Sequence, residues 1–511
     1  MSDDTVARVA SEGVVRVVPA AIALTGAGLA LEAGGYFPRA WIWSGVVLLW
    51  IAALAAAFRT PLSLDRRAAV FVGAMALLTG WTLLSATWSV EPQQTFLEAR
   101  RDVVYLGVAA AAIFGCSRLA AWHIPGAVLA ASTLIASLGV GRYLLSGPVD
   151  PFQKGLLSWP VGYANGFAAI SAVSLPLAFG LAAHGRLQAV RSAAAAAIAP
   201  LLAVLLVTSS RGGVFATAAG LVVVVLLDPR RRALIRTALR LALPVVVLVG
   251  VGIWAELPNV GGGTAGRRAA VGVTVLAVAA ISAFLVRGTA GRRRGAALPR
   301  PLALAFLLLV VLLGALVTAL PELGGERTLQ RLVGVERAGY WRVAWHVVTA
   351  HPWLGSGGGT FGRAWLEQGP PALAGALDAH GLYIEALAEL GPVGLVLLLV
   401  ALVVPLVSAR AAARASRFGA AAVAGYLAFL VHAFVDWDWE LPAVTLPALA
   451  LGAAVVILAR RSSSARPVGP RLRFVLVAAA VLVAVASLLG LRSNAQPAAA
   501  AAPRATAARV R

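Results

Sequence analysis

His380 is the residue whose sequence context best suits proton transfer. It follows Asp378, a residue type that caps helices, and it precedes GLYIEALAEL, which has the apolar spacing of a helix. The positive end of the helix dipole should keep the imidazole neutral, and a neutral imidazole can act as a general base. The alternative is a loop histidine with a structural hydrogen bond. His346 and His351 lack such a context, so we expect both at the surface.

Glu385 and Glu389 are acidic residues on the helix predicted after His380. They lie four residues apart, so their side chains share one face of that helix. Either carboxylate could orient the His380 imidazole or bind a sugar. Glu389 could equally belong to a helix end, because Gly391 follows it and glycine favours helix ends.

Asp436 and Asp438 form an Asp-x-Asp pattern, and carboxylates are suitable ligands for a divalent cation in nucleotide-sugar transferases. That role is disfavoured because the topology argued below places both residues outside, whereas nucleotide sugars are cytoplasmic. The alternative is an ion pair with Arg211 or Arg337. The sequence therefore predicts no metal site and no cofactor.

The glycine-rich run GSGGG at 355–359 is a poor phosphate-binding loop. No predicted strand precedes it and no Gly-Lys-Ser follows it, although such a loop needs both. We expect these glycines to let the chain turn sharply after a helix.

The elements that must position these residues are membrane helices. The chain has 511 residues, of which 60% are hydrophobic and 13% charged, against about 25% charged in soluble domains. A mean hydropathy of +0.87 excludes a soluble protein of this length. The net charge of +22 is attributed to arginines in cytoplasmic loops, so we expect membrane lipids and no nucleic acid as partners. The single cysteine, Cys116, excludes an intrachain disulfide.

The sequence predicts an all-α polytopic membrane protein of about 14 or 15 transmembrane helices. The predicted spans are 15–32, 40–57, 68–87, 103–117, 121–141, 161–183, 192–209, 212–227, 234–254, 269–286, 301–320, 389–408, 418–435, 441–459 and 474–491. Most arginines then fall in alternate loops, such as 228–233, which favours a cytoplasmic N-terminus in the cell membrane. The predicted regions are N-terminal spans 1–320, an outer loop 321–388, C-terminal spans 389–491 and a disordered tail 492–511.

The outer loop 321–388 should be folded on the membrane surface. It carries several tryptophans, among them Trp341 and Trp345, which recur with Arg337 at helical spacing. Tryptophan is enriched at headgroup depth, so an interfacial helix is expected here.

Several motifs together resemble those of the O-antigen ligase and polymerase superfamily. An Arg stands four residues before a Trp in 336–361, followed by HPWLGSGGGTF, and AHGLYIEALAELG follows at 379–391. SSRGGVFA at 209–216 and VGYANGFA at 161–168 are similar to two further family motifs, and HAFVDWDWELP at 432–442 is similar to the closing motif of actinobacterial members. One departure is Gly381, which stands where the family usually has Asn after the His.

The resemblance implies a GT-C-like glycosyltransferase that transfers a glycan from undecaprenyl pyrophosphate to a sugar hydroxyl at the outer face of the cytoplasmic membrane. An arginine fork donates two parallel hydrogen bonds to phosphate oxygens, so Arg337 and Arg211 would hold the leaving pyrophosphate, with Arg342 as a neighbouring candidate. The alternative for each arginine is a side chain that reaches lipid headgroups. His380 would be the base. The further candidates for substrate binding are Asn165, Glu385, Glu389, Asp436 and Asp438.

Two alternatives to a ligase remain. A polymerase would differ only in its acceptor, which no residue in the sequence identifies. A transporter or flippase should carry ionisable groups or repeated halves at the middle of the bilayer, whereas the spans here are nearly free of charge in their middles. The sequence therefore favours an enzyme.

Overall fold

The part of the protein that the structure describes is all-helical apart from one short strand pair. The computed structural model describes residues 3–146, 156–255, 264–287, 335–370, 376–460 and 466–493. Its main helices are α1 (Asp3–Leu31), α2 (Pro38–Phe58), α3 (Arg66–Ser85), α4 (Pro92–Gly115), α5 (Arg118–Ala121), α6 (Ile124–Ser146), α7 (Ala164–His184), α8 (Gln188–Thr208), α9 (Arg211–Leu227), α10 (Arg231–Trp254), α11 (Ala265–Leu285), α14 (Val335–Ala350), α15 (Phe361–Gln368), α16 (Leu382–Ala415), α17 (Gly419–Ala433), α18 (Pro442–Ala459) and α19 (Pro470–Ser493). The short 3-10 helices η1 (Ala33–Gly35) and η4 (Asp438–Glu440) complete the helical elements used below.

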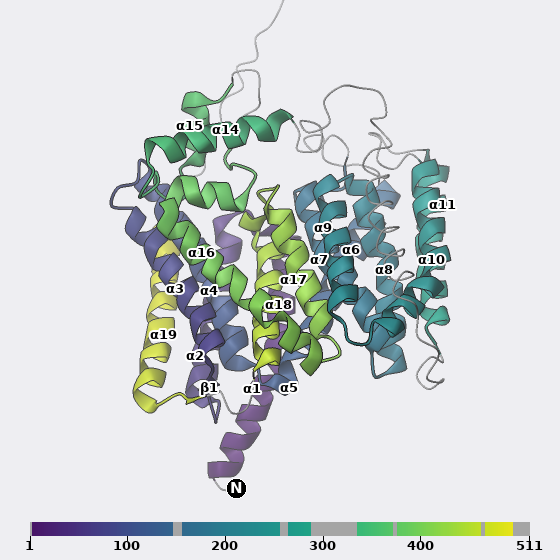
Figure 1. Cartoon of the computed structure of the whole chain (residues 1–511), viewed down its shortest axis with the longest axis horizontal. Coiled ribbons are helices and arrows are strands. Elements are labelled where there is room, and N and C mark those ends of the chain that lie inside the picture. Colours follow the sequence, from purple (N-terminus) through teal and green to yellow (C-terminus); the bar gives the residue numbers. More distant parts are fainter. Residues whose placement is uncertain are drawn as a thin grey trace, which may run out of the picture.

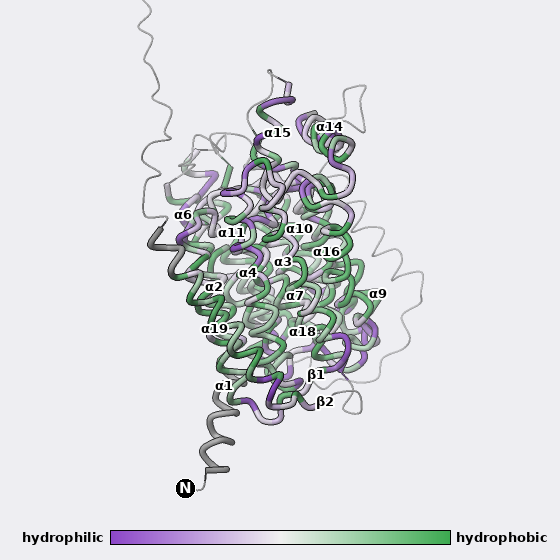
Figure 2. The backbone as a smooth tube through the Cα atoms, turned by 90° about the vertical axis from the view of Figure 1, so that its left-hand side faces the viewer, coloured by the Kyte–Doolittle hydropathy of each residue, from purple (hydrophilic) through white to green (hydrophobic). Residues whose placement is uncertain are grey.

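The long helices run side by side in one bundle, and α14 and α15 lie across one of its ends (Figure 1). Hydrophobic residues fill the middle of the bundle, while hydrophilic residues gather toward its two ends (Figure 2). Ten described helices are long and apolar enough to cross a membrane. This arrangement is that of a multi-pass membrane protein, as predicted, with α14 as the predicted surface helix.

Helices α7 and α18 form the centre of the bundle. In each, 94% of the most apolar window is buried, against 17% in α11 and 6% in α19. Small residues allow the close approach of neighbours: a Cβ at Gly180 would lie against Ala421, and one at Gly425 would lie 2.8 Å from the Val173 carbonyl oxygen. The central helices are therefore shielded from lipid, and α11 and α19 are peripheral.

The predicted spans coincide with helices wherever the structure describes them. The span predicted at 301–320 lies outside the described residues, as does most of the tail predicted at 492–511. Two boundaries differ from the prediction: α4 begins at Pro92 rather than near 103, and α16 begins at Leu382 rather than 389. Both extra segments carry charged residues that a hydropathy pattern assigns to loops.

A small sheet at the end opposite α14 brings together two segments that lie about 400 residues apart in the sequence. Strand β1 (Ser63–Leu64) pairs antiparallel with β2 (Arg466–Pro467), with Ser63 opposite Pro467. Arg460 donates a hydrogen bond to the Ser63 carbonyl oxygen at 3.1 Å. Helix α19, which follows β2, then packs against α2.

Candidate active site

Asp436 is the centre of a polar network at the α14 end of the bundle. Its side chain is 1% exposed, and its Oδ2 atom lies 2.8 Å from Nη2 of Arg337 on α14. Asn165 donates to the same oxygen at 2.8 Å, while the Tyr163 hydroxyl donates to Oδ1 at 2.8 Å. A buried carboxylate is stable only when charge and hydrogen bonds compensate it, and here both do. The predicted pairing of Asp436 with an arginine is thus present, with Arg337 as the partner.

His380 lies beside this network. Its ring stacks on Tyr340 with centroids 4.5 Å apart, and it meets Trp437 edge-on at 6.5 Å. The ring Nδ1 lies 3.1 Å from the Asp378 carbonyl oxygen, which can only accept a hydrogen bond. In a neutral ring Nδ1 is therefore the protonated nitrogen, and Nε2 keeps its lone pair.

Burial lowers the pKa of His380 below its usual value, and Asp436 opposes this shift. A neutral imidazole was expected from the sequence, but through a helix dipole with Asp378 as the cap. The helix instead begins at Leu382 with Gly381 at the cap position and no side-chain cap bond, so the assignment of Asp378 as cap is wrong. His380 has a φ of +53°, a conformation that histidine tolerates better than most residues, and this brings the chain into the helix.

The glycine at 381 has a steric explanation. A Cβ there would lie 3.1 Å from both the Phe434 carbonyl oxygen and Nε1 of Trp341. Trp341 itself donates to the His380 carbonyl oxygen at 3.3 Å. In this chain a tryptophan thus occupies the space that a side chain at 381 would need.

Helix α16 is broken at Gly391, which has a φ of 66°, and Pro392 follows without a backbone N–H. The break leaves carbonyl groups without their usual helical donors. Ser356 N donates to the Ala388 oxygen at 3.1 Å and Gly357 N donates to the Glu389 oxygen at 2.9 Å. The glycine-rich loop at 355–359 therefore completes the broken helix, and Gly355, Gly357 and Gly359 each adopt a positive φ to do so.

Glu385 and Glu389 hold the loops around the site through backbone amides. The Glu385 carboxylate accepts from Ala379 N at 2.6 Å, directly before His380. The Glu389 carboxylate accepts from Gly359 N at 2.7 Å and Phe361 N at 2.9 Å. Glu385 thus positions the segment that carries His380, and Glu389 fastens the glycine-rich loop.

Arg211 lies at the first position of α9, at the same end of the bundle. The next residue, Gly212, lies against His432. A Cβ added at Gly212 would lie 3.2 Å from Nε2 of the His432 ring. His432 and Asp438 are both 0% exposed and lie 3.1 Å apart through Nδ1 and Oδ1. The two acids of the Asp-x-Asp therefore point to different partners, Asp436 to Arg337 and Asp438 to His432.

Arg342 is separate from these groups. Its side chain is exposed, and within the described part of the chain it forms no ion pair. His346 and His351 are exposed as well, as expected from the sequence.

A second acidic region adjoins the site and was not anticipated. Carboxylate oxygens of Asp378, Glu385 and Glu440, here called the acidic cluster, lie within 4.8 Å of one another, a spacing that could hold a metal ion. Arg101 pairs with Glu440 at 2.6 Å and also with Glu98. Burial and the nearby Glu440 raise the pKa of Asp378 well above its usual range.

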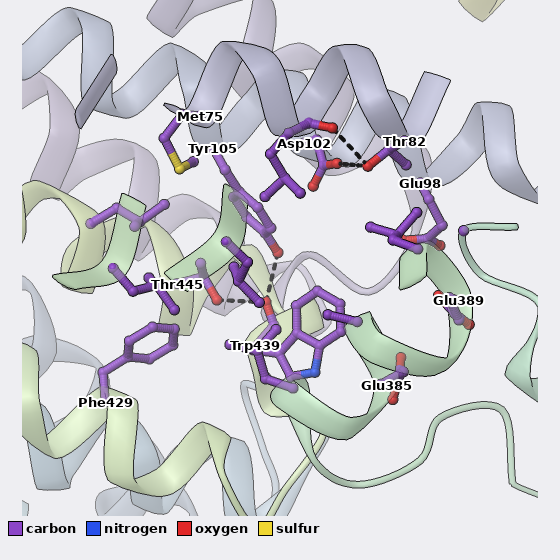
Figure 3. Close-up of a pocket in the computed structure, with 18 residues that line it drawn as sticks. Met75, Thr82, Glu98, Asp102, Tyr105, Glu385, Glu389, Phe429, Trp439 and Thr445 are labelled. Carbon is purple, nitrogen blue, oxygen red and sulfur yellow. Dashed lines mark hydrogen bonds between the residues drawn. The ribbon is translucent and has the colours of Figure 1, made fainter. Parts of the chain in front are cut away.

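The acidic side chains continue into a cavity of ≈ 70 Å³. Figure 3 shows Glu98, Asp102, Glu385 and Glu389 on one side of it, opposite Met75 and Phe429. Thr82 donates to Asp102 at 2.7 Å. Glu98 and Arg101 lie three residues apart on α4, a spacing that could have indicated the pair, and Glu440 stands within the 432–442 motif.

Part of the chain that carries this site is similar to a known protein family. Residues 262–399 match the family model of the O-antigen ligase. The chain is a membrane protein with an O-antigen ligase domain, and that domain contains Arg337, His380, Glu385 and Glu389. None of the curated proteins compared with the chain matches it. The partners of the O-antigen ligase domain at this site, Asn165 and Asp436, lie outside the matched residues.

Proposed function

We propose that the chain is a glycosyltransferase that joins a glycan from an undecaprenyl-pyrophosphate-linked donor to a sugar hydroxyl, as an O-antigen ligase does. The observation that carries the proposal is the convergence of Arg337 and His380 on Asp436. One residue is a fixed cation and the other an imidazole held neutral. Transfer from a pyrophosphate needs both kinds of group.

In the proposed step the acceptor hydroxyl oxygen attacks the anomeric carbon of the donor. Its proton passes to Nε2 of His380, the nitrogen left unprotonated by the bond of Nδ1 to the Asp378 carbonyl. The bond from the anomeric carbon to the pyrophosphate oxygen breaks, and undecaprenyl pyrophosphate leaves with that electron pair. Arg337 and Arg211 stabilise its negative charge.

Asp436 and Asn165 position Arg337 in this scheme. Arg337 contacts Asp436 through Nη2, and its side chain is 23% exposed at the edge of the network. Asn165 reaches the same carboxylate oxygen, so its role is to hold the network rather than to contact sugar. The acidic cluster could bind hydroxyl groups of the glycan, because carboxylates accept hydrogen bonds from sugars.

The site is proposed to face the outside, with the N-terminus in the cytoplasm. Arginines line the opposite end of the bundle, which supports that orientation. Cysteines introduced singly at 231 and 370, in a background without Cys116, test it with a membrane-impermeant reagent on intact cells. Labelling at 370 alone is expected. Labelling at 231 alone would show that the orientation is the reverse of the one proposed.

The acceptor distinguishes a ligase from a polymerase. The motif at 432–442 and the arginine-rich composition support an actinobacterial-type member, whose acceptor would be a wall polymer or a protein rather than lipopolysaccharide. The decisive experiment incubates the purified chain with a lipid-pyrophosphate glycan and follows release of undecaprenyl pyrophosphate. Release with formation of a new glycosidic bond is expected, and movement of intact donor across vesicles without release would indicate a transporter.

A further inference from the structure

Two neighbouring cavities that share wall residues lie at the end of the bundle opposite His380. Helix α9 connects the two ends: it begins at Arg211, beside His432, and it ends next to Asp228, which contacts His184 at 2.5 Å. Its 17 residues cover about 25 Å. The cavities measure ≈ 560 and ≈ 770 Å³ and share His184, Arg230 and Arg236 in their walls.

Arginine dominates the walls of both cavities. Seven arginines line the first cavity and six line the second, with Arg230 and Arg236 in both. Asp228 is the one acidic residue among the described lining residues, and its carboxylate already contacts the His184 ring. The described residues therefore leave a large positive charge uncompensated in this space.

Two of these arginines show the effect of the excess positive charge and of burial. Arg191 is 5% exposed and uses its Nε to contact the Ala182 carbonyl oxygen at 3.2 Å. Burial, followed by the neighbouring Arg186 and Arg230, lowers the pKa of Arg417. Arginines that crowd one another in a partly buried space favour a bound anion, and phosphate oxygens match the guanidinium fork.

We propose that these cavities bind the headgroup of an anionic membrane lipid that carries two phosphate groups. Two neighbouring cavities with Arg230 and Arg236 in the walls of both suit two linked phosphates better than one. Basic pockets between transmembrane helices on the cytoplasmic side are a known type of site for such headgroups.

The surrounding helices provide a path for acyl chains, which a soluble phosphate would not use. Leu239 and Leu243 on α10 are 65% and 72% exposed, and they lie on the same helix as Arg236 and Arg240. On α11, Phe284 is 66% exposed and directly precedes Leu285, which lines the first cavity. The headgroup would thus sit in the cavities while the chains lie along α10 and α11.

The test measures cardiolipin binding to the full chain in neutral detergent by native mass spectrometry. The double variant Arg230→Gln/Arg236→Gln removes the two shared arginines, which are exposed enough that the fold should tolerate the change. At about 1 kcal/mol for each arginine, binding should weaken about thirtyfold. The matched control is Arg66→Gln/Arg67→Gln, which removes the same charge from exposed positions at the same end and should bind like the wild type.

Two results would overturn the proposal. Equal losses in both double variants would indicate general attraction of lipid to a basic surface. Full displacement of cardiolipin by an equimolar amount of inorganic pyrophosphate would indicate a site for a soluble anion.

A measurement on the unmodified chain keeps the proposal testable if the variant fails to fold. A cardiolipin with photoactivatable acyl chains should crosslink to α10 and α11. Crosslinks spread evenly over the lipid-facing helices would contradict a specific site.

Discussion

Replacing His380 by asparagine separates the loss of the base from damage to the backbone. The residue has a φ of +53°, and asparagine tolerates this conformation, whereas alanine would add strain of about 1–2 kcal/mol. Asparagine also keeps a polar group near the Asp378 carbonyl oxygen. His380→Asn should therefore fold like the wild type and lose the proton acceptor alone.

The expected loss of transfer rate is about a hundredfold or more, the usual contribution of a general base. It is measured as release of undecaprenyl pyrophosphate at saturating donor, together with donor binding, which should be unchanged. His346→Asn is the matched control, because His346 is an exposed histidine on α14 and its loss should leave the rate unaltered.

The pH dependence provides a second readout for the same residue. The pKa of His380 lies below its ordinary value because the ring is buried, so the neutral form persists into mildly acidic solution. The rate should be flat near neutrality and should fall only as the pH drops through that lowered pKa. Loss of activity already at pH values above the ordinary pKa of histidine, or near wild-type transfer by His380→Asn, would refute the assignment of His380 as the base.

Three further predictions concern the rest of the site. Arg337→Lys keeps the positive charge but loses the forked guanidinium. Loss of one charge-assisted hydrogen bond of about 1.5–3 kcal/mol predicts a roughly ten- to hundredfold lower initial rate of transfer. An unchanged rate would exclude Arg337 from phosphate binding. Gly357→Ala would place a Cβ 2.8 Å from the Ser89 Cα at a φ of +103°, so thermal unfolding should show a loss of about 1–3 kcal/mol, whereas Gly80→Ala, with open space around it, should show none. EDTA should leave transfer intact, because Glu440 and Glu385 of the acidic cluster already contact Arg101 and the Ala379 amide. Inactivation by EDTA that magnesium or manganese reverses would instead assign a cation to the acidic cluster.

The membrane helices were predictable because long apolar segments have one stable structure in a bilayer. The two misplaced helix starts carry Glu98 with Arg101 on α4 and Glu385 on α16. Their charges are compensated only in the folded bundle, for example by the pairing of Arg101 with Glu440, 339 residues away. A hydropathy pattern cannot include such partners.

The roles given to the candidate site residues stay predictions, but the structure does show which of these residues lie together. Motif and chemistry predicted Arg337, His380 and Asp436 as candidates, and of the two arginine partners predicted for Asp436 the structure has Arg337. Tyr163, which donates to Asp436, was not singled out although it stands in the VGYANGFA motif at 161–168, because tyrosine is common at the membrane interface. The buried pair of His432 and Asp438 was also missed, since its two members are brought together by a turn between α17 and α18.

The repair of the broken α16 by the glycine-rich loop limits how such proteins can be recombined. Segments 355–359 and 388–392 share their backbone hydrogen bonds, and Trp81 of α3 donates to the Leu390 carbonyl oxygen at 2.9 Å. A chimera that imports α16 from a protein with a similar domain but without its loop would leave the Ala388 and Glu389 carbonyl groups without donors, each costing about 1–3 kcal/mol. Crossover points in such chimeras must therefore keep the loop, the helix break and Trp81 of α3 together from one parent sequence.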